Sequence, residues 1–578
     1  MTESTTQLNT GGQFLVESIT KTQVYSREDF TEEHHEIYNM VMEFDRDRIL
    51  SQKEEIEKYN PNLVKSLIKE MGDLGLLGVD APEEYGGMDL DKVTTAIVSE
   101  ALVQCPSFSV SWAVQTGIGA LPIIWFGTKE QKEKYLPGIV SGDLLCAYGL
   151  TEPTNGSDAV SAKTNAILSD DGKHYILNGE KIFITNGGWA DVYTVFAQVD
   201  GDKFSAFLVD KDTEGFSFGA EEKKLGMKGS STTPLIFQNA KVPVENLLYK
   251  VGKGATIAFN VLNIGRFKLG ASSVGGAKLV INGSSQYAQE RRAFGQSISN
   301  FDAIIKKIAN MTVRTFAADS MTYRTIGLLQ NEIDQLDKSS PDYHIQLGEA
   351  MEEFAIETSM VKVYGSDTSH YVIDEGLQIF GGYGFLEEYP LAGAYRDDRI
   401  NQIWEGTNEI NRQIIAGFMM KKALMEELPV RDAIRDISDY MSNGQLKFDD
   451  NTLAEECQSI ETAKRLALYL FNEALCEYGQ DLKHEQQLTE IFADIFTDIF
   501  TAESTVVRAR KIMASDSPES TVSDIAKVFT AEMGSRIMGN VHNAIGAIHD
   551  GDPSPLVDQK ISEFENRMRL KTNVIGLK

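Results

Sequence analysis

The feature that most constrains the fold is a change of pattern near Tyr148, where a long helical stretch gives way to short alternating runs that continue to about Val244. Runs such as 193–199 and 204–209 have the period of two that is typical of strands. Turn-forming pairs that end in glycine separate the runs and favour tight hairpins: Asp171-Gly172, Asn178-Gly179, Asn186-Gly187 and Asp200-Gly201. The pattern predicts an antiparallel β-domain of about 100 residues.

Helical patterns flank this run on both sides. Before it, amphipathic segments extend from Thr31 to about Cys146, and after it they resume near Gly252 and continue to about Lys422. A further acidic helical stretch follows Pro429. We therefore expect an α+β fold that is mainly α. In chain order we predict a lead-in (1–30), an N-terminal helical domain (31–147), a middle β-domain (148–250), a helical-bundle domain (251–424) and a C-terminal helical extension (425–578).

Composition narrows the choice of partners. The formal net charge of −30 disfavours binding to nucleic acid or to an anionic membrane through a basic patch. No apolar run reaches the roughly 18–20 residues that span a bilayer, and the first residues resemble neither a signal peptide nor a transit peptide. The four cysteines and eight histidines lack metal-ligand spacing. We expect reduced thiols, no metal site and a cytoplasmic protein.

The stretch 403–412 carries the strongest chemical signal. Thr407 is a good helix N-cap, Glu409 suits the first turn of the helix, and Gly406 allows a tight turn and a close ligand. Glu405 would then stand at the mouth of a helix beside Trp404, where partial burial would make its carboxylate a better proton acceptor. An ordinary surface glutamate before a capped helix is the alternative, and these ten residues alone favour it.

Two further segments could contact a flat polar ligand. The loop 148–158 opens the β-domain with small residues that bring backbone amides and hydroxyls together, although a plain turn explains it equally well. The strand 181–187 leads into a hairpin, and alternation puts Phe183 and Thr185 on one face, for ring stacking and hydrogen bonding. An ordinary strand is the simpler interpretation of that segment.

The helical part after the β-domain contains three more candidates. Asn263 to Arg266 begins a long predicted helix and 290–295 ends it. Arg291 at that end could pair with a pyrophosphate, but such arginines are more often simply solvated. The glycine-rich run 378–385 lacks the strand and helix context of a dinucleotide-binding fingerprint, so it is weak evidence by itself.

Taken in order, these motifs resemble the acyl-CoA dehydrogenase family of flavoenzymes over most of residues 30–420. The most specific matches are 150–158, 378–384 and Glu405-Gly406-Thr407, which are separated by an all-β insert between helical blocks. The helical region after Pro429 and the phrase 263–267 further resemble the very-long-chain branch.

The resemblance implies a role for each matching residue. Glu405 matches the catalytic base, because Gly265 occupies the position before Arg266 where some relatives carry the base instead. Phe183 stands where a tryptophan is usual in the family. Substrate contacts match Ser157, Asn263, Arg266, Trp404 and Gly406. FAD contacts match Tyr148, Leu150, Thr151, Gly156, Ser157, Phe183, Thr185, Arg291, Phe294, Gln378, Gly381, Gly382, Thr407 and Glu409.

The resemblance implies α,β-dehydrogenation of an acyl-CoA to the trans-2-enoyl-CoA, a step of fatty acid β-oxidation. It also implies a long-chain substrate and transfer of the electrons to electron-transferring flavoprotein. Arg291, Phe294 and 378–382 match residues that hold FAD across a subunit interface, so the resemblance implies at least a homodimer. Packing of the acidic extension in a bundle is favoured over peripheral membrane contact. Three alternatives stay open: an acyl-CoA oxidase, a nitroalkane-oxidase-like enzyme, which would prefer Asp to Glu405, and a non-catalytic assembly scaffold.

Overall fold

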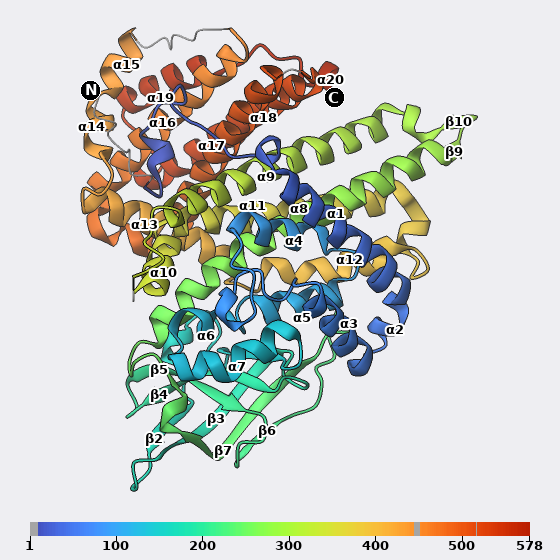
Figure 1. Ribbon diagram of the computed structural model, residues 1–578. Helices are drawn as coiled ribbons and strands as arrows, with labels where there is room; N and C mark the ends of the chain where they lie inside the picture. The colour runs from blue at the N-terminus through green and yellow to red at the C-terminus, as the bar shows by residue number, and fades with distance from the viewer. Residues whose placement is uncertain (1–9, 341, 444–450, 516) are drawn as a thin grey trace.

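A computed structural model describes residues 10–578, apart from 341, 444–450 and 516. Its β-sheet lies at one end of the molecule, the C-terminal helices lie at the other, and helices from both the N-terminal and the central parts fill the space between them (Figure 1). The mainly helical α+β fold predicted from the sequence is confirmed.

The first helices begin at side-chain caps. Thr31, Asn60, Asp91 and Thr128 each accept a backbone N–H in the first turn of the helix that follows, as expected for residues with short polar side chains. The helices of this part are α1 (Glu32–Phe44), α2 (Lys53–Glu57), α3 (Pro61–Asp73), α4 (Lys92–Ala101), α5 (Pro106–Thr116), α6 (Leu121–Phe126) and α7 (Lys129–Ser141).

One stretch corrects the expectation that no apolar run is long enough to cross a membrane. Pro106–Phe126 passes that test of length and composition. The structure breaks it into α5 and α6, and 78% of the apolar window is buried inside the protein. The run therefore supplies core packing between the helices and the sheet.

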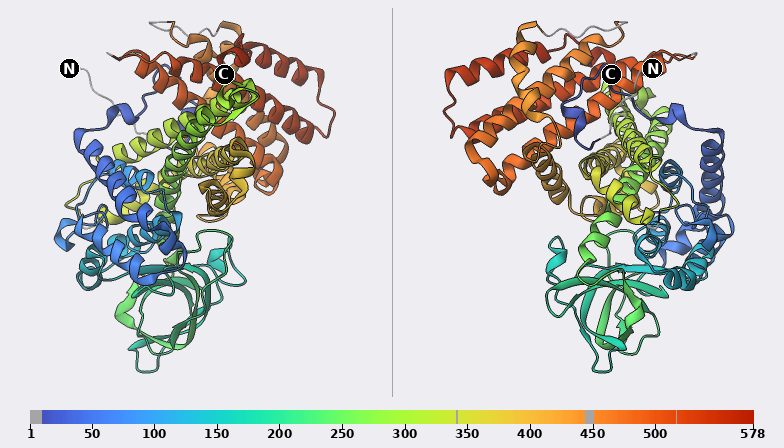
Figure 2. Two further views of the ribbon diagram at one scale, coloured as in Figure 1. Left: turned by 90° about the vertical axis from the view of Figure 1, so that its right-hand side faces the viewer. Right: turned by 60° about the vertical axis from the view of Figure 1, so that its left-hand side comes forward.

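The sheet is mixed, which corrects the prediction of a purely antiparallel domain. Its order is β6-β7-β3-β2-β4-β5-β8, and both β1 and β2 pair with β4 in parallel. Figure 2 shows the sheet curled at the base of the molecule. The strands are β1 (Cys146–Gly149), β2 (Asn165–Leu168), β3 (His174–Thr185), β4 (Val192–Val199), β5 (Lys203–Asp210), β6 (Phe216–Phe218), β7 (Thr232–Pro243) and β8 (Leu247–Leu248).

Two very long helices carry the chain away from the sheet. α8 (Gly254–Glu290) and α9 (Asp302–Ile333) are joined by the small hairpin of β9 (Arg292–Ala293) and β10 (Gln296–Ser297). Their partners are α10 (Tyr343–Glu353), α11 (Ala355–Phe380), α12 (Pro390–Asp398) and α13 (Asn408–Leu424). α8 starts nine residues before Asn263, so the residues predicted to begin the helix lie inside it.

The extension packs against these helices through one continuous apolar core. Residues of α9, α11 and α13 share that core with the last helices of the chain. The helices of the extension are α14 (Val430–Arg435), α15 (Ile437–Asn443), α16 (Ala454–Tyr478), α17 (Gln486–Met513), α18 (Thr521–Ile548), α19 (Pro555–Met568) and α20 (Val574–Leu577).

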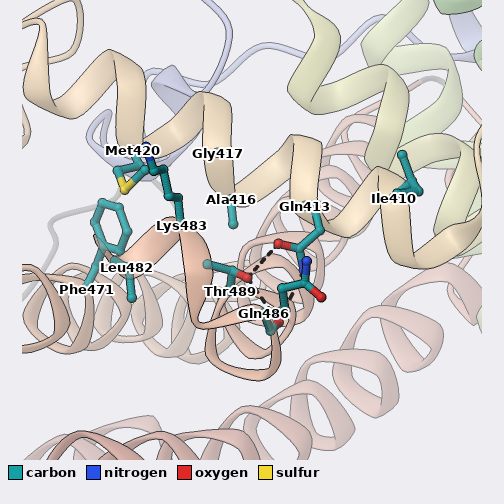
Figure 3. Close-up of a pocket in the computed structure, with 10 residues that line it drawn as sticks. All are labelled: Ile410, Gln413, Ala416, Gly417, Met420, Phe471, Leu482, Lys483, Gln486 and Thr489. Carbon is teal, nitrogen blue, oxygen red and sulfur yellow. Dashed lines mark hydrogen bonds between the residues drawn. The ribbon is translucent and has the colours of Figure 1, made fainter. Parts of the chain in front are cut away.

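The junction between α13 and the extension encloses a pocket of about 270 Å³ (Figure 3). Gln413 donates to the Gln486 carbonyl at 3.2 Å and accepts from the Thr489 hydroxyl at 2.8 Å. These polar groups thus satisfy one another at the edge of the pocket. The pocket is lined by Ile410, Gln413, Ala416, Gly417, Met420, Phe471, Leu482, Lys483, Gln486 and Thr489.

The segment 10–30, predicted to be a polar lead-in, is packed structure. Phe14, Leu15 and Ile19 are buried in the core that the extension shares with the central helices. The Gly12 N–H donates to Glu357 at 2.7 Å, and the Ile19 N–H donates to Glu461 at 2.7 Å. Residues 10–30 therefore connect α11 to α16.

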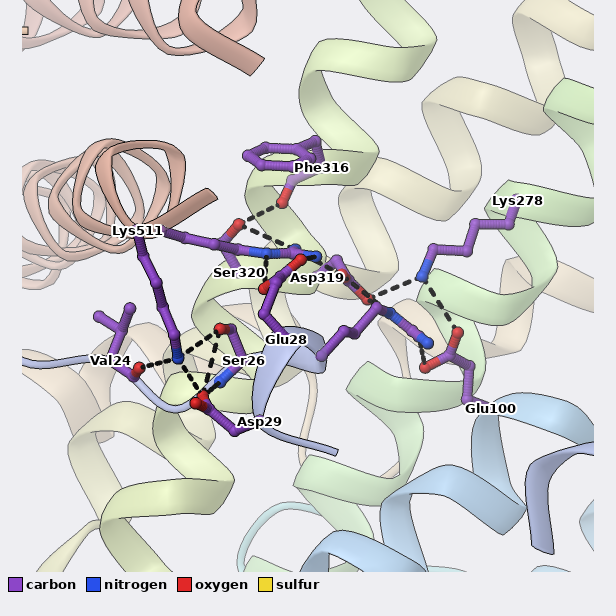
Figure 4. A network of polar contacts seen from close by, with 12 residues as sticks. Val24, Ser26, Glu28, Asp29, Glu100, Lys278, Phe316, Asp319, Ser320 and Lys511 are labelled. Atoms are coloured by element: carbon purple, nitrogen blue, oxygen red, sulfur yellow. Dashed lines mark hydrogen bonds and ion pairs between the residues drawn. The ribbon is translucent and has the colours of Figure 1, made fainter. Parts of the chain in front are cut away.

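A buried ion network strengthens the same junction (Figure 4). Asp319 on α9 accepts from Arg27 at 2.9 Å, from Lys278 at 2.8 Å and from Arg508 at 2.6 Å. These cations come from the N-terminal segment, from α8 and from α17. Arg27 and Lys278 also pair with Glu100 on α4. One carboxylate thus joins four parts of the chain that are remote in sequence.

Candidate active site

The candidate site is built around a strained turn just before α13. Glu405 has a φ of 56° and Gly406 a φ of 80°. Glycine adopts this left-handed conformation freely, whereas a glutamate does so only where its surroundings hold it. Thr407 ends the turn as the predicted N-cap and accepts the Ile410 N–H at 3.3 Å. The turn fixes where Glu405 stands.

The carbonyl groups of the turn are held from two helices. The Asn411 side-chain amide donates to the carbonyls of Glu405, Gly406 and Thr407 at 3.3, 2.8 and 3.1 Å. The Lys362 ammonium on α11 donates to the Gly406 carbonyl at 2.8 Å. The N–H groups of Glu405 and Gly406 have no acceptor among the described residues, so they can bind a ligand oxygen.

The Glu405 carboxylate lies against α8 where that helix has no side chain. A β-carbon built on Gly265 would be 2.4 Å from Glu405 Oε2. Burial raises the pKa of Glu405 to about 7, and the positive charges of Arg266, Lys362 and Lys268 counter that rise. A carboxylate with this pKa can accept a proton near neutral pH.

The cations around Glu405 are themselves buried. The Arg266 guanidinium donates to Asn263 Oδ1 at 2.7 Å, and burial lowers its pKa to about 10. Lys268 donates to the Thr116 hydroxyl at 2.8 Å and lies 4.4 Å from the centre of the Trp112 ring. Burial lowers the pKa of Lys268 to about 8. These charges oppose the effect of burial on the base without forming an ion pair with it.

Four buried polar atoms at this place have no partner among the described residues. They are the Tyr148 hydroxyl on β1, the Trp404 indole nitrogen, Glu405 Oε2 and Asn411 Oδ1. Burial raises the pKa of Tyr148 well above its usual range, and the Glu405 charge adds to that rise. Since buried polar groups in native proteins are normally hydrogen-bonded, four unpartnered atoms in one region indicate that a polar ligand completes the site.

The loop that follows β1 is clamped by a buried ion pair. The Lys181 ammonium donates to Glu152 at 2.7 Å and to the Leu150 carbonyl at 3.2 Å. The Ile182 N–H donates to the Thr151 carbonyl at 2.9 Å. The next predicted ligand residues, Gly156 and Ser157, are exposed. The loop is therefore held in place at residues 150–152 and exposed at Gly156 and Ser157.

Phe183 and Thr185 lie near the end of β3, but strict alternation does not relate them. The register between β3 and β7 shifts between Lys181 and Ile184, and Phe183 has a φ of 60° in that bulge. The prediction that Phe183 and Thr185 share one face assumed regular alternation along β3, and the bulge interrupts that alternation. The Phe183 ring is 62% exposed, which leaves a bare aromatic face at the end of the sheet.

The remaining predicted residues fall into two groups. Asn263 and Arg266 lie beside the turn, and Thr407 and Glu409 begin α13 directly after it. Arg291, Gly381 and Gly382 line a different pocket of about 600 Å³, with Arg291 placed over the Tyr383 ring. Gln378 and Phe294 lie exposed in the same part of the chain. The two groups are separated by most of α8, about 37 Å from Gly265 to Glu290 at 1.5 Å per residue.

Sequence reasoning missed four residues of the site: Lys181, Lys268, Lys362 and Asn411. Each is almost fully buried, and three are lysines, which are rarely buried without a partner or a role. Lysines inside apolar helical or strand segments were the available signal. The partners of the three lysines lie at least 29 residues away along the chain, so those contacts could not be read from the local pattern. Asn411, in contrast, bonds to carbonyls four to six residues before it, within the stretch 403–412.

The residues present fit a flavin dinucleotide with an acyl thioester. The free N–H groups of Glu405 and Gly406, the unpartnered Tyr148 hydroxyl and the bare Phe183 ring offer donors and a stacking surface. Binding of the dinucleotide here does not need a glycine loop between a strand and a helix, since the contacts come from other loops and from side chains.

Family models match along the chain in the order of the structural parts. Models described as acyl-CoA dehydrogenase N-terminal, middle and C-terminal domains match residues 31–143, 147–240 and 252–420. A further model of an acyl-CoA dehydrogenase C-terminal domain matches 462–557, inside the extension.

Individual relatives agree with these matches. A probable acyl-CoA dehydrogenase of Bacillus subtilis is 43% identical over 96% of this chain and 93% of its own length. The solved structure of an acyl-CoA dehydrogenase complexed with FAD from Bacillus anthracis has a TM-score of 0.94 and 41% identity, and the match covers 98% of this chain and 97% of that one. The very long-chain specific acyl-CoA dehydrogenase of Rattus norvegicus is 38% identical over 60% of this chain and 52% of its own length.

Coverage of nearly the whole chain, a shared fold and a glutamate poised before α13 lead to one conclusion. The chain belongs to the acyl-CoA dehydrogenase family of FAD-dependent oxidoreductases.

Proposed function

We propose that this protein converts long-chain acyl-CoA to trans-2-enoyl-CoA in fatty acid β-oxidation, with Glu405 as the catalytic base. The observation that carries the proposal is the turn at Glu405. Its carboxylate has the buried oxygen Oε2 and a pKa of about 7, and it stands beside two free backbone N–H groups. A base beside oxyanion donors is what removal of a weakly acidic α-proton needs.

The chain's own residues divide the work of the reaction. The N–H groups of Glu405 and Gly406 would bind the thioester oxygen as negative charge develops on it, and the carboxylate would take the α-proton. Trp404 and the α8 face at Gly265 would keep water from the base. FAD, when bound, supplies the acceptor for the β-hydrogen as hydride. Residues 148–157 and 183–185 would hold its ring.

The long-chain preference is supported by the extension and by Gly265, which leaves the base position to Glu405. The relative named as very long-chain specific matches 60% of this chain. We further propose electron-transferring flavoprotein as the acceptor, as the family resemblance implies, and keep the cytoplasmic location as a prediction.

A homodimer is part of the proposal. Arg291, which lines one pocket with Gly381 and Gly382, follows the end of α8, roughly 37 Å along that helix from Gly265 beside the base. This is too far for the pocket to share one flavin ring site with Glu405. The resemblance implies that such residues hold the FAD of a neighbouring subunit. If Arg291 holds the FAD of a neighbouring subunit in this protein, Arg291→Ala should release FAD from the oligomer without changing the Glu405 turn.

Product analysis separates the proposal from its alternatives. Purified holoenzyme is mixed with butyryl-CoA or palmitoyl-CoA, with either an artificial electron acceptor or oxygen alone. Enoyl-CoA that forms faster from palmitoyl-CoA, and only with the added acceptor, supports the long-chain dehydrogenase. Stoichiometric peroxide with oxygen alone would indicate an oxidase, and a protein that forms no enoyl product from any chain length would indicate a scaffold.

A further inference from the structure

Lys362 is a buried lysine that the reaction described above does not use. It lies on α11 with no exposed surface. It forms no ion pair with a carboxylate among the residues that the structure describes, and burial lowers its pKa to about 8. Since a buried unpaired ammonium costs free energy, the contacts that it makes must offset that cost.

Those contacts all lead to the turn of the base. The Lys362 ammonium donates to the Gly406 carbonyl at 2.8 Å and to Asn408 Oδ1 at 2.7 Å. Asn408 is held in place by Asp367, to which its amide donates at 2.8 Å, and by Ser366 at 3.1 Å. Residues 362–367 of α11 thus form hydrogen bonds with both ends of the Gly406–Asn408 segment.

Asn411 alone cannot hold this turn. Its amide has two hydrogens, whereas three carbonyl groups lie within its reach. Arg266 approaches the Glu405 carbonyl only at 3.5 Å, which is marginal for a hydrogen bond. Lys362 makes the short, charge-assisted contact with the Gly406 carbonyl, and such contacts are the strongest of this type.

Holding the carbonyls also orients the amides. A trans peptide is planar, so its N–H points opposite to its carbonyl oxygen. With the Glu405 and Gly406 carbonyls drawn toward Asn411, Arg266 and Lys362, the Gly406 N–H is turned away from them and stays free. The left-handed φ of Glu405 is sustained by the same contacts.

The charge of Lys362 adds to its geometry. The groups that act on Glu405 are Arg266 and Lys268 from α8, Lys362 from α11, and Tyr148 from β1. Arg266 is bonded to Asn263 and Lys268 to Thr116, whereas Lys362 is bonded to the turn itself. Glu405, Asp367 and Glu409 in turn favour the charged form of Lys362, and Arg266 opposes it.

We infer that Lys362 is a positioning residue for the dehydrogenation: its ammonium fixes the Glu405–Gly406 turn and favours the ionised form of the base. This inference rests on the proposed function. It assigns the residue no direct contact with substrate or flavin. It does assign α11 a part in setting the pH at which the base works.

The test compares holoenzyme variants by stopped-flow reduction of the bound flavin with palmitoyl-CoA, without oxygen, from pH 5.5 to 9. Lys362→Met should slow the limiting rate by about tenfold to a hundredfold and raise the pH midpoint of its acidic limb by about one unit. Lys362→Arg, which keeps the charge, should restore the midpoint but only part of the rate. Lys422→Met removes another buried lysine, one that pairs with Glu353 away from the turn, and should change neither value.

Asn408→Ala is the second variant, which tests the same inference if Lys362→Met does not fold. It removes one acceptor but leaves the charge in place, so a slower rate with an unshifted midpoint is expected. A Lys362→Met protein with full flavin content, the wild-type rate and the wild-type midpoint would overturn the inference, as would a wild-type rate in Asn408→Ala. If the wild-type protein itself reacts with no acyl-CoA, the proposed function fails first, and that result is distinct from either variant outcome.

Discussion

The Glu405 carboxylate lies in the space that a side chain at Gly265 would fill, with Oε2 only 2.4 Å from the β-carbon that residue 265 lacks. The two residues are 140 positions apart and come from the turn before α13 and the interior of α8. The resemblance puts the base of some other family members at the position of Gly265. In this chain α8 instead provides a bare surface on which the base from the other position rests.

Gly265→Ala should therefore displace the base while leaving the fold intact. The added methyl group meets the end of a flexible side chain, so the protein should unfold at nearly the wild-type temperature. A displacement near 1 Å can cost about a hundredfold in rate, and we expect a loss of that size in flavin reduction by acyl-CoA. Gly283→Ala, on the same helix with open space around it, is the control and should react normally. Equal rates for the two variants would show that the contact with Gly265 does not position Glu405.

The reduction rate should rise with pH through about 7. The pKa of Glu405 is raised to about 7, so the carboxylate is mostly protonated at pH 6 and mostly ionised at pH 8. Only the ionised form accepts a proton. Limiting rates of flavin reduction should fit a single ionisation near pH 7. A midpoint near pH 4.5, the ordinary value for a glutamate, would mean that the base is solvated.

The same burial predicts that Glu405→Gln stabilises the protein at alkaline pH. The folded-state pKa of Glu405 lies above its ordinary value of 4.5, so the ionised form is disfavoured in the folded state. This penalty is absent below pH 4.5, grows between pH 4.5 and 7, and is complete above pH 7. Denaturant unfolding should show Glu405→Gln to be more stable by up to about 3 kcal/mol at pH 8.5 and by much less at pH 5. A variant that is less stable than wild type at pH 8.5 would contradict this account.

Asp319→Asn should weaken the junction with the extension. Arg27, Lys278 and Arg508 share this buried carboxylate, and their charges hold its pKa far below the usual range. Loss of one partner from a buried network costs about 3–5 kcal/mol, which chemical denaturation can measure. The exposed pair of Arg46 and Asp47 supplies the control, since Asp47→Asn should change stability by less than about 0.5 kcal/mol. Equal effects of the two substitutions would show that the network adds nothing beyond a surface pair.

Glu152→Gln should loosen the loop 148–158, which carries several of the predicted FAD contacts. It leaves the Lys181 ammonium buried without its counter-charge, so the loop from Leu150 onward loses its clamp. We expect FAD to dissociate about tenfold more readily, as measured by flavin fluorescence on dilution. Glu214→Gln breaks the exposed pair with Lys241 in the same sheet region and should leave FAD binding unchanged. Unaltered FAD retention in Glu152→Gln would show that the pair of Glu152 and Lys181 does not hold this loop in place for FAD.

The sequence predicted the order of structural parts because periodicity is a local property, and the helices and strands follow it closely. It also singled out Glu405, since Gly406 and Thr407 mark a turn and a helix start over a few adjacent residues. It could not show that Gly265 faces Glu405, or that Lys362 holds Gly406, because those contacts join segments tens to hundreds of residues apart. The bulge at Phe183 and the parallel pairing of β1 with β4 escaped for a similar reason: both depend on the register of neighbouring strands, which a single strand does not encode.

The measurement that tests the central claim most directly is an anaerobic titration of the holoenzyme with palmitoyl-CoA, followed by the visible absorption of the flavin. Wild-type flavin should bleach as enoyl-CoA forms, and the flavin of Glu405→Gln should stay oxidised. Glu426→Gln is the matched control, since Glu426 is also a glutamate with a left-handed backbone, at the exposed far end of α13, and it should bleach like wild type. Bleaching of Glu405→Gln at the wild-type rate would contradict the assignment of Glu405 as the base.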